Sequence, residues 1–293
     1  MPNLSFRQEV EVRVVYNGTR YKIGVTEIDF GQTFQEKSFE VKTLHNQSSF
    51  EGSVINQANP AEFSLTTPLI KEDTNRVIFD RLLDSATFDI YISTQSADVW
   101  KLEKCVIQDG TFEINKSRPL RLAISGEASK LSKYSGTIPG SDPSPTTTTY
   151  IVPALTTLTL GSDDVSSSVV SLSVELQNDI NWNNYNTLQG SVSATNAATS
   201  MYPENFTSGT KVLGGSISKY LEEGSTNALT WNSNTSLRLK AGTTGTFKGI
   251  DFNISNCSFT NRVSSGEVFR EEYNWRMIQN PTALSSVITY NTV

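Results

Sequence analysis

The sequence predicts a mainly β protein with a minor helical part, built as two tandem copies of one unit. Segments in which apolar and polar residues alternate are spread along the whole chain, and a period of two places the apolar side chains on one face of a sheet. One segment has helical spacing instead, and a Gly-Ser-Val sequence follows a polar stretch in each half. The 293 residues suffice for two cores.

The strands of the first half begin with a hairpin. Val12 and Val14 alternate with charged residues, Asn17-Gly18 supplies a two-residue turn, and Ile23 lies on the returning strand. Further segments with the same alternation are FEVKTL, TFDIYIS, WKLEKCVI, GTFEI and LRLAIS in the first half and VSLSVELQNDI, SLRLKA, IDFNIS and EEYNWRMI in the second.

A helix is predicted at residues 73–84. Asp73 or Thr74 can act as its N-cap, and apolar residues then recur on one helical face. Downstream, residues 134–150 contain Pro, Gly, Ser and four consecutive Thr, which predicts a semi-extended linker. The sequence therefore predicts a first domain at 1–133, a linker at 134–150 and a second domain at 151–293.

Three pairs of features suggest that the second domain duplicates the first. Gly52-Ser53-Val54 corresponds to Gly190-Ser191-Val192, and the same separation places the helical FDRLLD on ISKYLE, which predicts a second helix at 217–223. Cys105 and Cys257 then fall on corresponding strands, with an insertion before the second. Because both cysteines are isolated, we expect free thiols in a reducing compartment.

Composition argues against several classes of function. The formal net charge is −6, both halves carry an excess of acidic residues, and there is no basic tract to hold nucleic acid. The N-terminal segment lacks the apolar core of a signal peptide, and no apolar run is long enough to cross a membrane. We therefore expect no membrane insertion.

The sequence predicts no catalytic residue, no cofactor site and no metal site. His45 is the only histidine and lies in a polar stretch, with no Gly-x-Ser-x-Gly sequence elsewhere. The acidic pairs Asp163-Asp164, Glu222-Glu223 and Glu271-Glu272 are adjacent residues, which on a strand point to opposite faces. A glycosidase that uses two carboxylates remains the least favoured alternative.

Two polar loops are predicted, at 45–50 and 179–188. The first contains His45 and Phe50, and the second contains Trp182 and Tyr185 among asparagines. Exposed aromatic residues are common anchors at protein interfaces, and we take these four as candidate assembly residues. A sugar-binding platform, and hence a carbohydrate-binding or adhesin module, is the alternative interpretation of Trp182 and Tyr185.

This organisation resembles that of the duplicated tail tube and baseplate tube proteins of long-tailed siphophages. The resemblance rests on the alternating strands at 9–25, 37–44 and 168–177, the two polar loops, and the helices at 73–84 and 217–223. It implies a tail-tube-like β-sandwich in each domain, with sheets that close into a ring-shaped β-barrel when three chains assemble.

The resemblance also implies a set of partners. A homotrimeric ring would contact adjacent tail tube rings and tail-tip or baseplate proteins, and DNA would pass through its lumen only transiently. The protein would be a structural virion protein, made in the host cytoplasm, without enzymatic activity. The short segment after the last predicted strand favours a baseplate ring, and the main tail tube subunit is the alternative.

Overall fold

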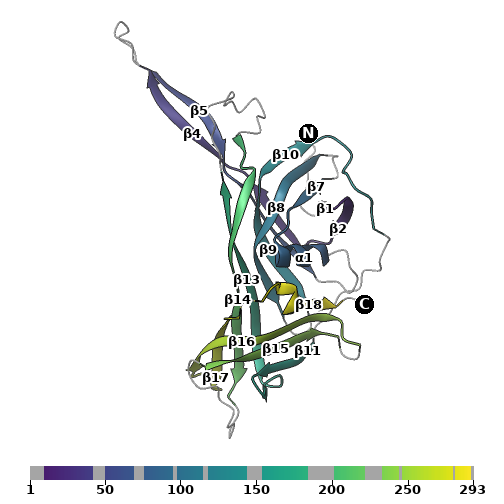
Figure 1. Cartoon of the computed structure of the whole chain (residues 1–293), viewed down its shortest axis with the longest axis vertical. Helices are drawn as coiled ribbons and strands as arrows, with labels where there is room; N and C mark the ends of the chain where they lie inside the picture. Colours follow the sequence, from purple (N-terminus) through teal and green to yellow (C-terminus); the bar gives the residue numbers. More distant parts are fainter. Residues whose placement is uncertain are drawn as a thin grey trace.

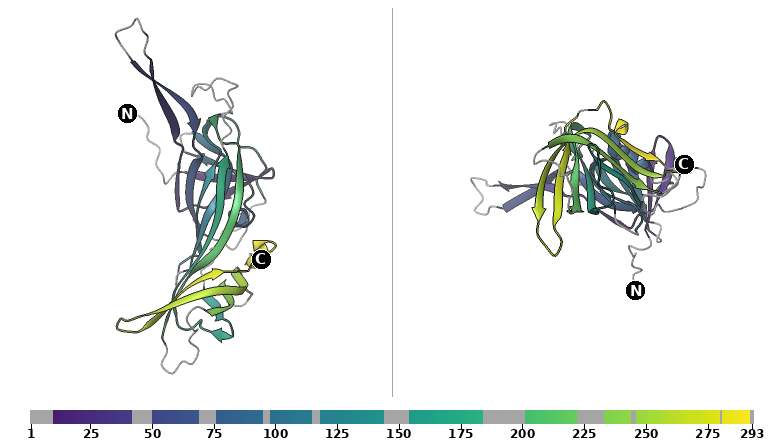
Figure 2. Two further views of the ribbon diagram at one scale, coloured as in Figure 1. Left: turned by 60° about the vertical axis from the view of Figure 1, so that its left-hand side comes forward. Right: turned by 90° about the horizontal axis from the view of Figure 1, so that it is seen from below.

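The computed structural model describes residues 10–41, 50–68, 76–94, 98–114, 118–143, 154–183, 201–221, 233–243, 246–279 and 281–291. The molecule is elongated and consists almost entirely of antiparallel strands (Figure 1). A two-stranded hairpin, β4–β5, projects from one end, and the β16–β17 hairpin projects at the other (Figure 2). The predicted mainly β fold is confirmed.

The first half contains one ordered series of paired strands, β2-β1-β7-β8-β9-β6-β3, with β10 added to the beginning of β8. The bounds are β1 Glu11–Tyr16, β2 Thr19–Ile23, β3 Glu27–Gly31, β4 Phe34–Val41, β5 Phe50–Ala58, β6 Ala61–Pro68, α1 Arg76–Asp84, β7 Phe88–Ser93, β8 Val99–Glu113, β9 Arg121–Ala128 and β10 Lys130–Tyr134.

The second half repeats this order as β12-β11-β15-β16-β17-β14-β13, with β18 added to the beginning of β16. The bounds are β11 Ala154–Leu160, β12 Asp163–Asp164, β13 Val169–Asn183, β14 Asn205–Tyr220, β15 Ser233–Gly242, β16 Gly249–Ser264, β17 Arg270–Met277, the 3₁₀ helix η4 Leu284–Ser286 and β18 Ile288–Asn291. Cys105 on β8 and Cys257 on β16 occupy corresponding strands, as predicted, and both are buried and free.

The helix α1, described from Arg76 to Asp84, confirms the first predicted helix. The candidate caps Asp73 and Thr74 lie outside the described residues. The helix packs closely on β8, because a Cβ added to Gly110 would lie 2.5 Å from a methyl carbon of Leu82. A side chain at position 110 would therefore force Leu82 to move.

The predicted second helix at 217–223 is wrong over the residues that the structure describes. Ile217 and Lys219 lie in β14, where they pair with Tyr273 and Glu271 of β17. The similarity between FDRLLD and ISKYLE was therefore not a structural correspondence. By strand pairing, Ile217 instead matches Leu65 of β6, since Leu65 pairs with Ile124 of β9 as Ile217 pairs with Tyr273 of β17.

The two halves share one hydrophobic core. Phe112 of β8 makes edge-to-face contacts with Phe79 of α1 and Phe252 of β16, at ring-centroid separations of 5.9 and 5.4 Å. Phe79 also contacts Tyr290 of β18 at 5.5 Å. The helix of the first half is therefore packed directly against the last strand of the second, which fixes the two halves relative to each other.

Candidate assembly surface

The functional surface that the fold offers is a continuous eight-stranded sheet in the order β3-β6-β9-β8-β13-β14-β17-β16. Each half contributes four of these strands. The junction between the halves is the antiparallel pairing of Ser173–Gln177 on β13 with Asp109–Glu113 on β8. The two halves are thus joined edge to edge by a ladder of backbone hydrogen bonds.

One face of this sheet forms the core. At the junction, Val174 lies opposite Phe112, and both side chains are completely buried. The neighbouring pair, Ser173 and Glu113, points to the other face because successive side chains on a strand alternate. At the junction the sheet therefore has a packed apolar side and a polar side that faces solvent.

The polar face is acidic. The strand pairings show which residues share this face, and more of them carry carboxylates than guanidinium groups. The acidic residues are Glu27, Asp29, Glu62, Glu127, Asp109, Glu113, Glu175 and Glu272, and the basic residues are Arg121, Arg262, Arg270 and Arg276. Arg262 forms an ion pair of 2.6 Å with Glu272. An excess of carboxylates on one face produces a potential that repels phosphates.

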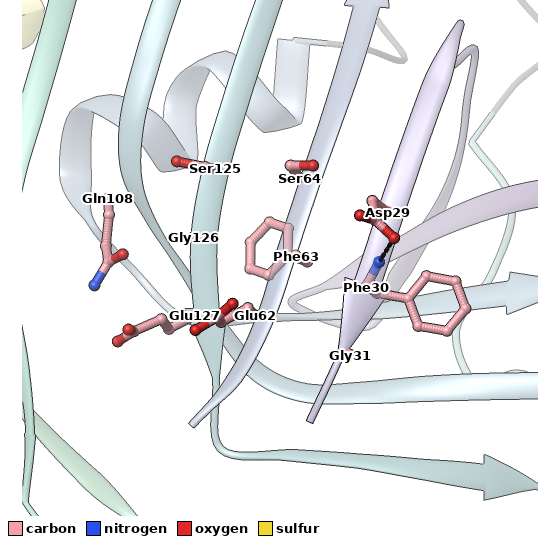
Figure 3. Close-up of a pocket in the computed structure, with 10 residues that line it drawn as sticks. All are labelled: Asp29, Phe30, Gly31, Glu62, Phe63, Ser64, Gln108, Ser125, Gly126 and Glu127. Carbon is pink, nitrogen blue, oxygen red and sulfur yellow. Dashed lines mark hydrogen bonds between the residues drawn. The ribbon is translucent and has the colours of Figure 1, made fainter. Parts of the chain in front are cut away.

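A hollow on this polar face lies between β3, β6, β9 and β8 (Figure 3). Glu62 of β6 pairs with Glu127 of β9. On its other side Glu62 pairs with Gly31 of β3, which has no side chain. Burial and then the nearby Glu62 carboxylate raise the pKa of Glu127, while the neighbouring Gln108 and Trp182 side chains partly offset this. The hollow is therefore a site of like charge that is unfavourable until a cation compensates it.

Two edges of the eight-stranded sheet have no partner strand among the described residues. One is the outer edge of β3, whose only pairing is with β6. The other is the edge of β16 at Thr260–Ser264, which pairs only with β17 on its opposite side. Such edges are open to pairing with another chain.

The structure describes one of the four predicted assembly residues in full. His45 and Tyr185 lie outside the described residues, and Phe50 begins β5, where only the backbone is described. Trp182 belongs to β13, so residues 179–183 of the loop expected at 179–188 are strand. Its ring lies 5.2 Å from that of Phe206 on β14. This within-chain packing extends the strand through Asn183.

Sequence reasoning missed the two sheet edges and the acidic hollow. The alternation of Glu27, Ile28, Asp29 and Phe30 was an available signal for an additional strand with an acidic face. The described residues include no group of three or more His, Cys, Asp or Glu placed to hold a metal. None of the described helices has the length and apolar character that crossing a membrane requires.

Comparison with known proteins gives the family. The sequence profile of the Bacteriophage Baseplate Tube Protein Family matches residues 3–83 and 80–292. The chain belongs to this family. The resemblance to tail tube and baseplate tube proteins is thereby confirmed, and the two matched stretches fit a duplicated chain.

A curated relative agrees with this assignment. Baseplate tube protein p140 of Escherichia phage T5 is 25% identical over 149 residues, which cover 45% of this chain and 50% of that protein. The match thus spans about half the length of the relative. Membership of the family gives the chain a structural role in a phage tail tube and a place in the virion tail.

Proposed function

We propose that three copies of this chain form a ring of the tail tube at the baseplate, with a lumen through which DNA passes. The observation that carries the proposal is the eight-stranded sheet, which joins two four-stranded halves into one curved wall. Three such walls would supply six similar units. Closure would remove the free strand edges, as it does in β-barrels.

In this ring the acidic face of the sheet lines the lumen. Carboxylates such as Glu113 and Glu175 repel DNA phosphates, so the DNA slides without being held. The apolar face stays inside the wall, covered by α1 and by the outer strands. The chain acts by assembly and not by catalysis, and it contacts adjacent tube rings and tail-tip proteins.

The domain limits of this proposal are those expected from the sequence. Residues 1–133 and 151–293 form the two tube domains, and 134–150 connect them around the ring. The described part of this segment packs on the first domain: Tyr134 ends β10, Asp142 binds Arg20 through two hydrogen bonds of 2.7 Å, and Ser141 pairs with the turn at Gly18.

Electron microscopy of the purified protein tests the proposal directly. We expect rings with three-fold symmetry and six similar lobes around a pore wide enough for duplex DNA. Native mass spectrometry should give three times the 32.3 kDa mass of the chain. Only monomers or two-fold dimers, at high protein concentration and under assembly-promoting salt conditions, would contradict it.

A further inference from the structure

The junction inside the chain has a counterpart at the ends of the sheet. In the first half, β8 carries β9 on one side and β13 on the other at Asp109–Glu113. In the second half, β16 carries β17 in the same way, and its other side at Thr260–Ser264 has no partner among the described strands. The first-half strand that corresponds to β13 is β3, because β3 pairs with β6 as β13 pairs with β14. The outer edge of β3 has no partner among the described strands.

We propose that β3 of one copy pairs with β16 of the next copy, in the register that β13 and β8 use within the chain. This inference rests on the proposed ring and specifies its contacts. The internal pairs between β13 and β8 are Ser173 with Glu113, Val174 with Phe112 and Glu175 with Thr111. Replacing each residue by its equivalent on β3 or β16 gives three antiparallel pairs between copies. They are Asp29 with Ser264, Phe30 with Val263, and Gly31 with Arg262 of the adjacent copy.

The register follows from the strand ladders. Phe30 matches Val174, because Phe30 pairs with Phe63 as Val174 pairs with Gly215 in the next strand of the other half. Val263 matches Phe112, because Val263 pairs with Glu271 where Phe112 pairs with Leu122. The internal pair of Val174 with Phe112 therefore becomes Phe30 with Val263 between copies.

The difference in burial between equivalent positions supports this pairing. Phe112 is completely buried at the internal junction, whereas Val263 is 48% exposed. Val174 is likewise completely buried, whereas its equivalent Phe30 is only half-buried. Both apolar side chains of the proposed pair thus lack the cover that their equivalents have. Addition of one strand would bury both on the core face.

Charge on the polar face also matches. Arg262 would lie opposite Gly31, whose missing side chain leaves the way open to Glu62 on the adjoining strand. The backbones of Arg262 and Glu62 would lie two strand spacings apart, which is roughly 10 Å. Two long side chains can span this distance. The guanidinium of Arg262, which pairs with Glu272 in the single chain, would turn into the hollow that Asp29, Glu62 and Glu127 line (Figure 3). It would supply the compensating cation there.

Paired cysteines test the register. In the chain carrying Asp29→Cys and Ser264→Cys, mild oxidation should give covalent dimers and trimers that reducing agent dissolves. The matched control carries Asp29→Cys and Thr260→Cys, four residues out of register on the same face, and keeps Arg262. Its Cα separation would exceed the 7 Å or so that a disulfide tolerates, so it should not cross-link.

A charge exchange tests the role of Arg262. Arg262→Glu should weaken ring formation at least tenfold, and adding Glu62→Arg should restore it, whereas Glu175→Arg on the same face should leave assembly unchanged. Circular dichroism verifies that each variant folds.

Rings of the expected symmetry without in-register cross-linking, or with equal cross-linking in the control, would overturn this pairing and leave the ring proposal standing. Absence of any ring would overturn both.

Discussion

The ammonium nitrogen of Lys219 lies 2.8 Å from a carboxylate oxygen of Glu271, and the two side chains are only 5% and 4% exposed. The carboxylate also accepts a hydrogen bond of 2.7 Å from the hydroxyl of Tyr273. At the equivalent position of the first half, Thr67 pairs with Leu122. This buried ion pair is therefore a feature of one copy only.

Breaking this ion pair should be costly, and replacing it should not. We expect Lys219→Met or Glu271→Leu alone to lower the free energy of unfolding by about 3 to 5 kcal/mol, because each leaves a buried charge without its partner. The double variant should regain most of this loss. Urea unfolding of the four chains measures the coupling. Single variants as stable as the wild type would show that the pair is hydrated.

The shared core predicts cooperative unfolding of both halves. Phe112→Ala should lower the stability by about 3 to 5 kcal/mol, because it removes a completely buried ring that contacts Phe79 and Phe252. Val268→Ala, at a 52% exposed position, is the control and should change stability little. Denaturation followed by fluorescence and by circular dichroism should show one transition. Two transitions, with only one displaced, would mean that the halves unfold independently.

The two thiols should be unreactive in the folded protein. Burial raises the pKa of Cys257 to about 12 and raises that of Cys105 well above its usual value. At pH 8 both groups are therefore protonated and weakly nucleophilic. A thiol reagent such as DTNB should modify neither in the native state and both in denaturant. The Ser264→Cys variant serves as a positive control with one accessible thiol.

The acidic hollow predicts a dependence on pH. The raised pKa of Glu127 means that the folded state binds its proton more readily than the unfolded state does. This carboxyl therefore favours folding increasingly as the pH falls from above its folded pKa toward the ordinary value of 4.5. Glu62→Gln should lower the pKa of Glu127, measured by NMR titration of the side-chain carboxyl carbon, whereas Glu175→Gln should not. An unchanged titration in Glu62→Gln would place the cause in burial alone.

Local patterns in the sequence predicted much of the fold. Alternation identified the strand at 88–93 and the first part of the strand at 169–183, and the Asn17-Gly18 turn identified the first hairpin, where both residues have positive φ angles. The helix at 76–84 followed from apolar spacing. Each of these depends on neighbouring residues alone, so the sequence determined a mainly β chain with an acidic surface and no evident catalytic set.

The pairing of distant strands was decided only by the tertiary structure. ISKYLE has apolar and charged residues at spacings compatible with a helix, yet the described part of this segment is a strand. Its Ile217 and Lys219 pair with β17, and the buried ion pair between Lys219 and Glu271 stabilises the strand, which the local pattern does not reveal. Long-range pairing and burial override local preference in this way, because strand propensity depends on neighbouring strands.

The same reason explains why the assembly surface could not be found from the sequence. Loop aromatics suggested contacts at 45–50 and 179–188, whereas the open edges belong to β3 and β16, far apart in the chain. An edge exists only relative to the strands that pair beside it, and no single segment encodes that relation. The duplicated pattern was visible in the sequence, but the equivalence of Val263 with Phe112 required the strand ladders, because register is a property of paired backbones.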